Sequence, residues 1–340
     1  MDTNHKMAIV LSLLAICSNS FSKSAIIEKP DNTKKTPIKR VSFFPNNEQI
    51  EKGYILKNPC PICIGYDNTL YIGDVNYCVV YNYDKNGEYI KSFGKKGQGP
   101  EEYGAVHHLA AFKGGLALED GENMRISIID NKGKQTNSFK IFKSYSDIAI
   151  SEDEKILVSP RRENHLIEIL DNKGQIIGSL GEKLKFKNKH VALNEVFIQA
   201  NSKGDIYVAW KYFPIVKKYS QRRGFEAEYD IDDQGIRELI KKNKSASDSV
   251  MKSNRISLMG IINCFFLSDN YFYVFLYGND RARIVEYDYR GEKTAIYEII
   301  DDLEKVIYIS MGVIEKGYER TFYVVQAFPE AQVDIYKESH

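Results

Sequence analysis

The sequence lacks an excess of charge of either sign, and it has almost no long apolar run. Its 340 residues carry 47 Lys and Arg against 46 Asp and Glu, a net charge of +1 with neutral histidines. A dedicated nucleic-acid-binding protein is usually strongly basic, so this balance argues against that class. Beyond the N-terminus no segment is long and apolar enough to span a membrane as a helix. We therefore expect no nucleic-acid partner.

Familiar catalytic motifs are missing as well. The sequence has no His-Glu-x-x-His zinc motif and no Gly-x-Ser-x-Gly nucleophile elbow, and no cysteine carries the local signature of a nucleophile. Carboxylates are plentiful, but nothing in their spacing singles out a glycosidase pair. These absences favour binding over catalysis.

Cysteine is scarce, with five residues in the chain. Cys60 and Cys63 form a C-x-x-C pair, but the flanking residues are typical of strands, and a redox motif needs a helix. We favour free cysteines buried in a β core for these two and for Cys78 and Cys264. A Cys60–Cys63 or Cys60–Cys78 disulfide is the alternative, since an oxidising compartment would permit it.

The one apolar run lies at the N-terminus. Residues 7–17, MAIVLSLLAIC, follow Lys6 and precede small polar residues, which is typical of a signal peptide cleaved after Ser20. The alternative is lipidation, because LLAIC resembles a bacterial lipobox ending at Cys17, although Ile16 stands where a small residue is expected. We expect export to the periplasm, the cell surface or the medium, with contact to a membrane only through a lipid on Cys17.

Two kinds of hairpin alternate along the rest of the chain. The first kind has two strand-like runs around a polar turn, and it occurs at 62–74, 109–120, 148–159, 197–210, 264–277 and 311–325. The second kind occurs at 79–93, 126–139, 167–180, 216–229 and 284–297. Four of the second hairpins turn through Asp-x-x-Gly, in which Asp caps the turn and Gly adopts a left-handed conformation. These begin at Asp84, Asp130, Asp171 and Asp288.

Two hairpins in tandem make a four-stranded antiparallel unit of the size of a propeller blade. Six first hairpins therefore predict an all-β fold, a six-bladed β-propeller over residues 38–340. The last unit stops after three strands, and an unclosed ring would leave exposed sheet edges. We expect an N-terminal strand from 38–45 or 53–58 to complete the last blade and close the ring.

Two segments fall outside this pattern. Residues 21–37 are polar and are predicted to form a disordered linker behind the signal peptide of residues 1–20. At about 232–254, apolar residues such as Ile236 and Ile240 recur at helical spacing, which predicts a helical insertion between two blades. This insertion is interpreted as a tolerated surface segment, with a lid or a partner contact as the alternative.

Residues 61–94 resemble the NHL repeat, with a proline start, a YIGD second strand, an Asn before the third strand and a Gly-terminated turn. The segment 94–104, GKKGQGPEEYG, resembles the Gly-x-Gly-Pro-Gly-Glu-Phe linker of secreted bacterial six-bladed propellers related to NHL proteins. Glu101 replaces the third glycine and Tyr103 replaces the Phe. Beyond about residue 190 only the hairpin rhythm remains. The resemblance implies an exported propeller from a family mostly without assigned function.

The glycine-rich segment 93–104 also raises the question of phosphate binding. It matches neither the P-loop nor the dinucleotide fingerprint, and no helix pattern follows it. We interpret it as a crossover from the outer strand of one blade to the inner strand of the next, where glycines permit a sharp backbone and Pro100 stiffens it.

The resemblance also directs the search for a site. Related propellers include metal-dependent lactonases, amidating lyases and streptogramin lyases, whose sites line the central channel at one face. This implies candidates among the polar residues around each first strand, and we predict that His107, Asp147, His190 and Asn194 face the channel and bind the ligand. A zinc or calcium ion would need three or four converging ligands, which the spacing does not demand. We expect no catalytic residue and no cofactor, with a divalent metal in the channel as the alternative.

The sequence thus predicts an exported, monomeric, non-catalytic propeller. Its partner is expected to be a protein, a peptide or a glycan at one face, because a rigid ring of blades presents loops around a central funnel. A metal-dependent lyase or hydrolase with its site in the channel is one alternative, and a structural cell-surface protein is another.

Overall fold

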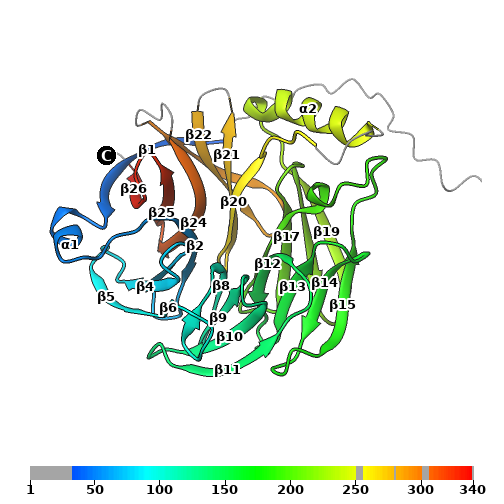
Figure 1. Ribbon diagram of the computed structural model, residues 1–340. Helices are drawn as coiled ribbons and strands as arrows, with labels where there is room; N and C mark the ends of the chain where they lie inside the picture. The colour runs from blue at the N-terminus through cyan, green and yellow to red at the C-terminus, as the bar shows by residue number, and fades with distance from the viewer. Residues whose placement is uncertain (1–32, 250–255, 279–280, 301–305, 339–340) are drawn as a thin grey trace, which may run out of the picture. The chain divides into compact units, whose positions relative to one another are not determined.

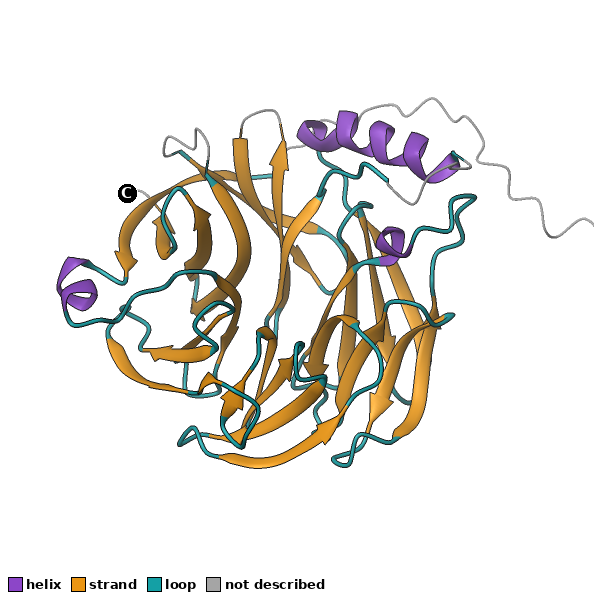
Figure 2. Ribbon diagram, viewed as in Figure 1, coloured by secondary structure: helices purple, strands orange, loops and turns teal. Residues whose placement is uncertain are grey.

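The computed structural model describes residues 33–249, 256–278, 281–300 and 306–338, which are built mainly from β-strands (Figure 1). Figure 2 shows how few helices accompany them. The expected signal peptide and most of the expected linker lie outside the described residues. None of the described helices has the length and apolar character needed to cross a membrane.

Four antiparallel sheets have four strands each, in which consecutive strands are paired. Their strands are rich in Val, Ile, Tyr and Phe, the residues that suit a pleated, half-buried surface. The first sheet has β2 (Pro59–Ile64), β3 (Leu70–Asp74), β4 (Val79–Tyr83) and β5 (Tyr89–Phe93). The second has β8 (Val106–Phe112), β9 (Gly115–Asp120), β10 (Arg125–Asp130) and β11 (Gln135–Lys140). The third has β12 (Tyr145–Ile150), β13 (Ile156–Pro160), β14 (His165–Leu170) and β15 (Ile176–Glu182). The fourth has β16 (Val196–Ala200), β17 (Asp205–Trp210), β18 (Ile215–Ser220) and β19 (Gly224–Asp230).

The remaining large sheet is eight-stranded, with the order β20-β21-β22-β23-β1-β26-β25-β24. One half is formed by β20 (Ile262–Leu267), β21 (Tyr271–Gly278), β22 (Arg281–Asp288) and β23 (Lys293–Ile299). The other half is formed by β24 (Ile307–Lys316), β25 (Glu319–Phe328), β26 (Gln332–Glu338) and the N-terminal β1 (Lys35–Phe44).

The strand β1 joins the two halves. It pairs antiparallel with β26 from Ile38 to Phe44, and parallel with β23 from Lys35 to Ile38. The last three residues of the segment expected to be a linker, 35–37, therefore belong to a strand, because β23 offers them hydrogen-bonding partners. Sequence periodicity could not reveal this pairing, since the two strands lie about 260 residues apart in the chain.

The first strands of the hairpin repeats contact one another in a closed cycle. β2 contacts β8, β8 contacts β12, β12 contacts β16, β16 contacts β20, β20 contacts β24, and β24 contacts β2. These strands form the wall of a central channel within residues 33–340. Apolar clusters fill the spaces between neighbouring sheets, and Trp210 is fully buried in the cluster between the third and fourth sheets.

The predicted Asp-to-Gly turns are confirmed. Asp84 Oδ1 accepts the amides of Asn86 at 2.8 Å and Glu88 at 2.9 Å, while Gly87 adopts φ +84°. The turns at 130–133, 171–174 and 288–291 repeat both side-chain hydrogen bonds and the positive φ of the glycine.

The four turn glycines also lie against aromatic rings of a preceding outer strand. The pairs are Gly87 with Phe44 of β1, Gly133 with Phe93 of β5, Gly174 with Phe139 of β11, and Gly291 with Tyr229 of β19. An added Cβ would come within 2.2 to 2.9 Å of the nearest ring atom in these pairs. β1 therefore makes the same contact as the fourth strands of three other sheets.

In the glycine-rich crossover between the first two sheets, the Glu102 carboxylate binds the backbone amides of the same loop. It contains the short paired strands β6 (Lys95–Lys96) and β7 (Glu102–Tyr103). Glu102 Oε2 accepts the amides of Gln98 at 3.2 Å and Gly99 at 2.9 Å. Those amides are the groups that a phosphate would need, so the structure favours the crossover over a phosphate loop.

Two α-helices are described, α1 (Asn47–Glu51) and α2 (Arg237–Asp248). α2 lies between β19 and β20 in the chain, and at the top of Figure 1 it sits beyond the end of β17. Its Leu239 and Ile240 pack against an apolar cluster that spans the fourth and fifth sheets. The buried Asn243 donates to the carbonyls of Tyr212 at 2.8 Å and Met259 at 2.7 Å. These contacts fix α2 at the end of the ring where the first strands begin.

Candidate functional site

One end of the channel holds a polar cavity of about 350 Å³, here called the channel cavity. All six first strands contribute to its lining, at the end where each of them begins. The polar and charged lining residues are His107, His108, Ser146, Asp147, Arg161, Glu195, Gln199, Lys211, Asn263 and Ser310. Two of the four residues predicted to bind a ligand, His107 and Asp147, are among them.

The strand β8 brings two adjacent histidines to this cavity. A bulge between Val106 and His108 leaves His107 without a partner residue on β9, so that both side chains are available near the channel. His107 is exposed and lies over Gly121, where an added Cβ would come 2.0 Å from its Nδ1 atom. The absence of a side chain at Gly121 therefore makes the room that His107 occupies.

His108 forms a hydrogen bond through Nδ1 to Oε2 of Glu119, which is buried on β9. Burial by itself lowers the pKa of His108, but the hydrogen bond and the negative charge of Glu119 outweigh this effect and raise the pKa above its usual value. The pair is therefore a proton-holding group beside the cavity.

Asp147 uses both of its oxygens on backbone amides. Oδ1 accepts the amide of Ile148 at 2.9 Å, and Oδ2 accepts the amide of Ile198 at 2.8 Å. The second bond crosses from β12 to β16 and so joins two neighbouring sheets. Burial raises the pKa of Asp147 to about 6, although the nearby His108 opposes this rise. Asp147 thus contributes to the architecture of the channel as well as to its charge.

Three charged residues that the sequence analysis did not select also line the channel cavity. Arg161 and Lys211 both pair with Glu195, Lys211 at 3.7 Å, and Arg161 Nε also donates to the Tyr145 carbonyl at 3.0 Å. Arg161 directly follows β13 and Lys211 directly follows β17, whereas Glu195 precedes β16. Their positions next to strand ends could have indicated that they line the cavity. In an antiparallel blade these ends lie on the same side of the sheet as the first residues of the first strand.

The cysteines and the candidate metal ligands can be placed directly. Cys60, Cys63, Cys78 and Cys264 are all free, and Cys60 and Cys264 line the channel cavity. Burial raises the pKa of the Cys60 thiol, with the charge of Lys211 opposing the rise, so it is a poor nucleophile at neutral pH. Among the described residues no three His, Cys, Asp or Glu side chains gather as a metal site would require.

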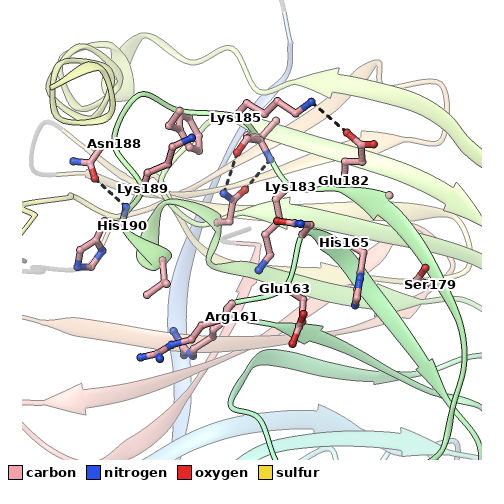
Figure 3. Close-up of a pocket in the computed structure, with 17 residues that line it drawn as sticks. Arg161, Glu163, His165, Ser179, Glu182, Lys183, Lys185, Asn188, Lys189 and His190 are labelled. Carbon is pink, nitrogen blue, oxygen red and sulfur yellow. Dashed lines mark hydrogen bonds and ion pairs between the residues drawn. The ribbon is translucent and has the colours of Figure 1, made fainter. Parts of the chain in front are cut away.

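His190 and Asn194 do not line the channel cavity. They line a second cavity of about 880 Å³, here called the lateral cavity, beside the third and fourth sheets (Figure 3). His190 Nδ1 accepts the Ala192 amide at 3.2 Å and so begins a short 3-10 helix. Asn194 accepts from Trp210 Nε1 at 3.1 Å and exchanges two hydrogen bonds with the backbone of Leu184. The amide of Asn194 therefore holds the loop that forms the cavity wall.

The two cavities are neighbours, because Arg161 lines both of them. A third cavity, of about 420 Å³, lies at the other ends of the first strands and is lined by Tyr66, Asn68 and Asp269 among others. Ile62 and Leu109 line both this far-end cavity and the channel cavity. The polar Gln199 lines both cavities as well, so the channel has a polar region at each end with Ile62, Leu109 and Gln199 between them.

Comparison with known proteins bears on the fold. No known family matches the sequence, and no curated protein matches it either. A solved candidate exported protein from Bacteroides fragilis is similar in structure, with TM-score 0.58 and 13% identity over 90% of this chain and 100% of that one. A catalytically inactive histidine-to-alanine variant of virginiamycin B lyase from Staphylococcus aureus, solved with quinupristin, has TM-score 0.53 and 10% identity over 88% of this chain and 99% of that one. The Pan2 WD40 domain of Neurospora crassa has TM-score 0.50 and 9% identity, over 90% and 95%.

The chain has an all-β propeller fold with four-stranded antiparallel blades. This conclusion rests on the sheet topology together with the structural neighbours. At identities of 9 to 13% the likeness concerns the fold alone, because one propeller fold carries many unrelated functions.

Proposed function

We propose that the chain is an exported propeller, related to NHL-repeat proteins, that binds its ligand at the channel cavity and does not transform it. The observation that carries this proposal is the convergence on one cavity of polar and charged groups from five of the six first strands and from residues next to the strand ends. A cavity with a few polar groups aimed into it is the usual form of a ligand site. The partner is a peptide, a protein segment or a glycan bound by a monomer.

The proposal includes six blades in a ring that β1 closes. The cycle of contacts among six first strands supports this count, which divides the eight-stranded sheet into two blades. The antiparallel pairing of β1 with β26 supports closure, since it gives the last three strands their fourth. The contact between Phe44 and Gly87 supports it too, because it repeats the contact that outer strands make elsewhere in the ring.

Export is part of the proposal and rests on the sequence of residues 1–20, which lie outside the described residues. The likeness to a candidate exported protein is consistent with it. Fractionation of producing cells tests export, and replacement of Cys17 with Ser separates a lipid anchor from simple secretion. We expect a processed protein outside the cytoplasm, and a full-length cytoplasmic protein would contradict export.

Within the site, His107 is proposed to contact the ligand directly, while Asp147 positions the strands around it. His190 and Asn194 are proposed to shape the adjoining lateral cavity. The test is binding to arrays of glycans and peptides, comparing wild type with His107→Ala and with Asn68→Ala at the far-end cavity as a matched control. Binding that is lost only in His107→Ala supports the proposal, and binding lost only in Asn68→Ala overturns it.

A channel-centred lyase is the second candidate. The likeness to virginiamycin B lyase, in which one histidine-to-alanine substitution abolishes catalysis, together with the His108–Glu119 pair beside the cavity, favours it. Two measurements separate the candidates, namely the metal content of protein purified without chelators and mass spectrometry of the bound compound. Stoichiometric zinc or calcium lost in His107→Ala, or a chemically altered ligand, would support the lyase.

A further inference from the structure

The lateral cavity has a cationic lining that the proposed function does not use. Five of its lining residues are Lys or Arg, against two Glu. The cations are Arg161, Arg162, Lys183, Lys185 and Lys189, and the carboxylates are Glu163 and Glu182. His165 and His190 add imidazole rings to the lining. The chain as a whole is close to neutral, so this excess of positive charge is local.

The two carboxylates pair with only one of these cations, Lys185. Glu163 pairs with Lys143, which is outside the lining, at 3.1 Å, and Glu182 pairs with Lys185 at 3.7 Å. Arg162 and Lys189 have no carboxylate partner among the described residues, and both are exposed to solvent in the cavity. Their charges are therefore available to a bound anion.

Lys183 is the most informative of the cations. Its Nζ donates to the carbonyl of Pro160 and points into the space near Arg161 and His165 (Figure 3). No carboxylate pairs with it among the described residues. Burial lowers the pKa of Lys183 to about 8, only partly offset by the charge of Glu163. An anion placed beside this partly desolvated ammonium group would stabilise its charged form.

The neutral lining suits a hydroxylated ring better than an apolar anchor. Phe186 presents an aromatic ring that stacks on Phe213, with centroids 4.7 Å apart and planes 20° from parallel. Ser179 and Asn188 add a hydroxyl and an amide to the same lining. The lining includes few apolar side chains, and the volume of about 880 Å³ lies in the usual range for small-molecule sites.

We propose that the lateral cavity binds an acidic oligosaccharide, whose carboxylate or sulfate groups contact Lys183, Lys189 and Arg162. The ligand continues past Arg161 into the channel cavity, since that residue lines both spaces. This inference rests on the proposed function, and it names the ligand class for it. The basic segment RRENH, residues 161–165, then contributes Arg161 and Arg162 to an anion site.

Calorimetric titration with tetragalacturonate and with a heparin-derived tetrasaccharide tests this proposal. We expect at least one of them to bind wild type, and we expect Lys183→Met and Lys189→Met each to weaken binding about tenfold, because each removes a charge-assisted contact. Lys132→Met is the matched control, because Lys132 lies in the exposed turn of the second sheet. Lys189 is exposed, so its replacement keeps the test valid even if Lys183→Met fails to fold.

The outcomes separate the two proposals. Binding weakened by His107→Ala but not by the lysine variants overturns the lateral cavity and leaves the channel site standing. Binding to an octaglutamate peptide but to neither tetrasaccharide overturns the ligand class. If neither tetrasaccharide binds wild type the inference is wrong, whereas the array experiment with neutral glycans and peptides still decides the proposed function. If only the Lys132→Met control weakens binding, the ligand binds at neither the lateral cavity nor the channel cavity, and both proposals are wrong.

Discussion

Asp147 both connects two sheets through hydrogen bonds and is a buried titratable group in the channel. Its two oxygens hold amides of two sheets, and burial keeps its pKa near 6, above the value of an ordinary aspartate. A carboxyl whose pKa is raised on folding favours the protonated form. Its contribution to stability is therefore greatest below about pH 4 and is lost as pH rises through about 6.

We predict that Asp147→Asn destabilises the protein by about 1–3 kcal/mol at pH 4.5, because its amide nitrogen cannot accept the second backbone hydrogen. The difference from wild type should shrink between pH 4.5 and pH 7.5, since only wild type must ionise a buried carboxyl. Urea unfolding at the two pH values measures both effects. If the difference in unfolding free energy between wild type and Asp147→Asn grew with pH, the prediction of a raised Asp147 pKa would be contradicted.

At the same scale the sequence predicted two residues that line the channel cavity. His107 and Asp147 follow from their position at the start of first strands, because blade geometry brings those starts together. Arg161, Glu195 and Lys211 were missed because they lie just outside the strands, where sequence pattern alone does not separate a lining residue from a solvated one. The placement of His190 and Asn194 depends on the loop after β15, whose path no local rule specifies.

At the scale of elements, the turn glycines combine a local requirement with a packing requirement. Gly174 has φ +79°, and a Cβ there would come 2.3 Å from Phe139. Gly224 has φ +76°, with no atom within 4 Å of an added Cβ. An alanine would therefore have a strained left-handed backbone at either position, but only at position 174 would its Cβ collide with an aromatic ring.

We predict that Gly224→Ala destabilises the protein by about 1 kcal/mol, the cost of a left-handed non-glycine residue. Gly174→Ala should cost about 1–3 kcal/mol more, because Phe139 has to move. Thermal unfolding of the two variants measures the difference. Equal effects would show that the aromatic contact does not stabilise the neighbouring sheets.

A buried ion pair joins β22 to β25. Arg320 Nε donates to Glu286 Oε2 at 2.9 Å, both side chains are about 5% exposed, and Arg320 lies over the ring of Tyr271. We predict that Arg320→Met destabilises the protein by about 3–5 kcal/mol, since it leaves a buried carboxylate without its partner. The double variant with Glu286→Gln should recover part of this loss. Denaturant unfolding of both variants checks it, and a small effect of Arg320→Met would contradict a tightly packed pair.

The hairpins themselves were predictable, because Asp-x-x-Gly turns and alternating strands depend on residues within about 15 positions of one another. The parallel pairing of Lys35–Ile38 with Ile296–Ile299 was not predictable, because the paired residues lie about 260 positions apart in the chain. The aromatic contacts between sheets could not be predicted either, because the sequence pattern within one hairpin does not indicate which residue of another sheet it packs against.

At the scale of the whole molecule, β1 connects the two ends of the chain. It supplies Phe44 to Gly87 and pairs with both β23 and β26. We predict that a protein starting at residue 46 exposes the edges of those two strands and aggregates. Sedimentation velocity measures this outcome, and a monomeric truncated protein of unchanged stability would contradict closure by β1.

The central claim is that the ligand binds at the end of the ring where the first strands begin. Hydrogen exchange of the wild-type protein, with and without the tetrasaccharide that binds more tightly, tests it most directly. We predict slower exchange at residues 107–108, 161–165 and 183–190, with no change at 66–68. Protection confined to 66–68 and 269–270, at the far-end cavity, would contradict the claim.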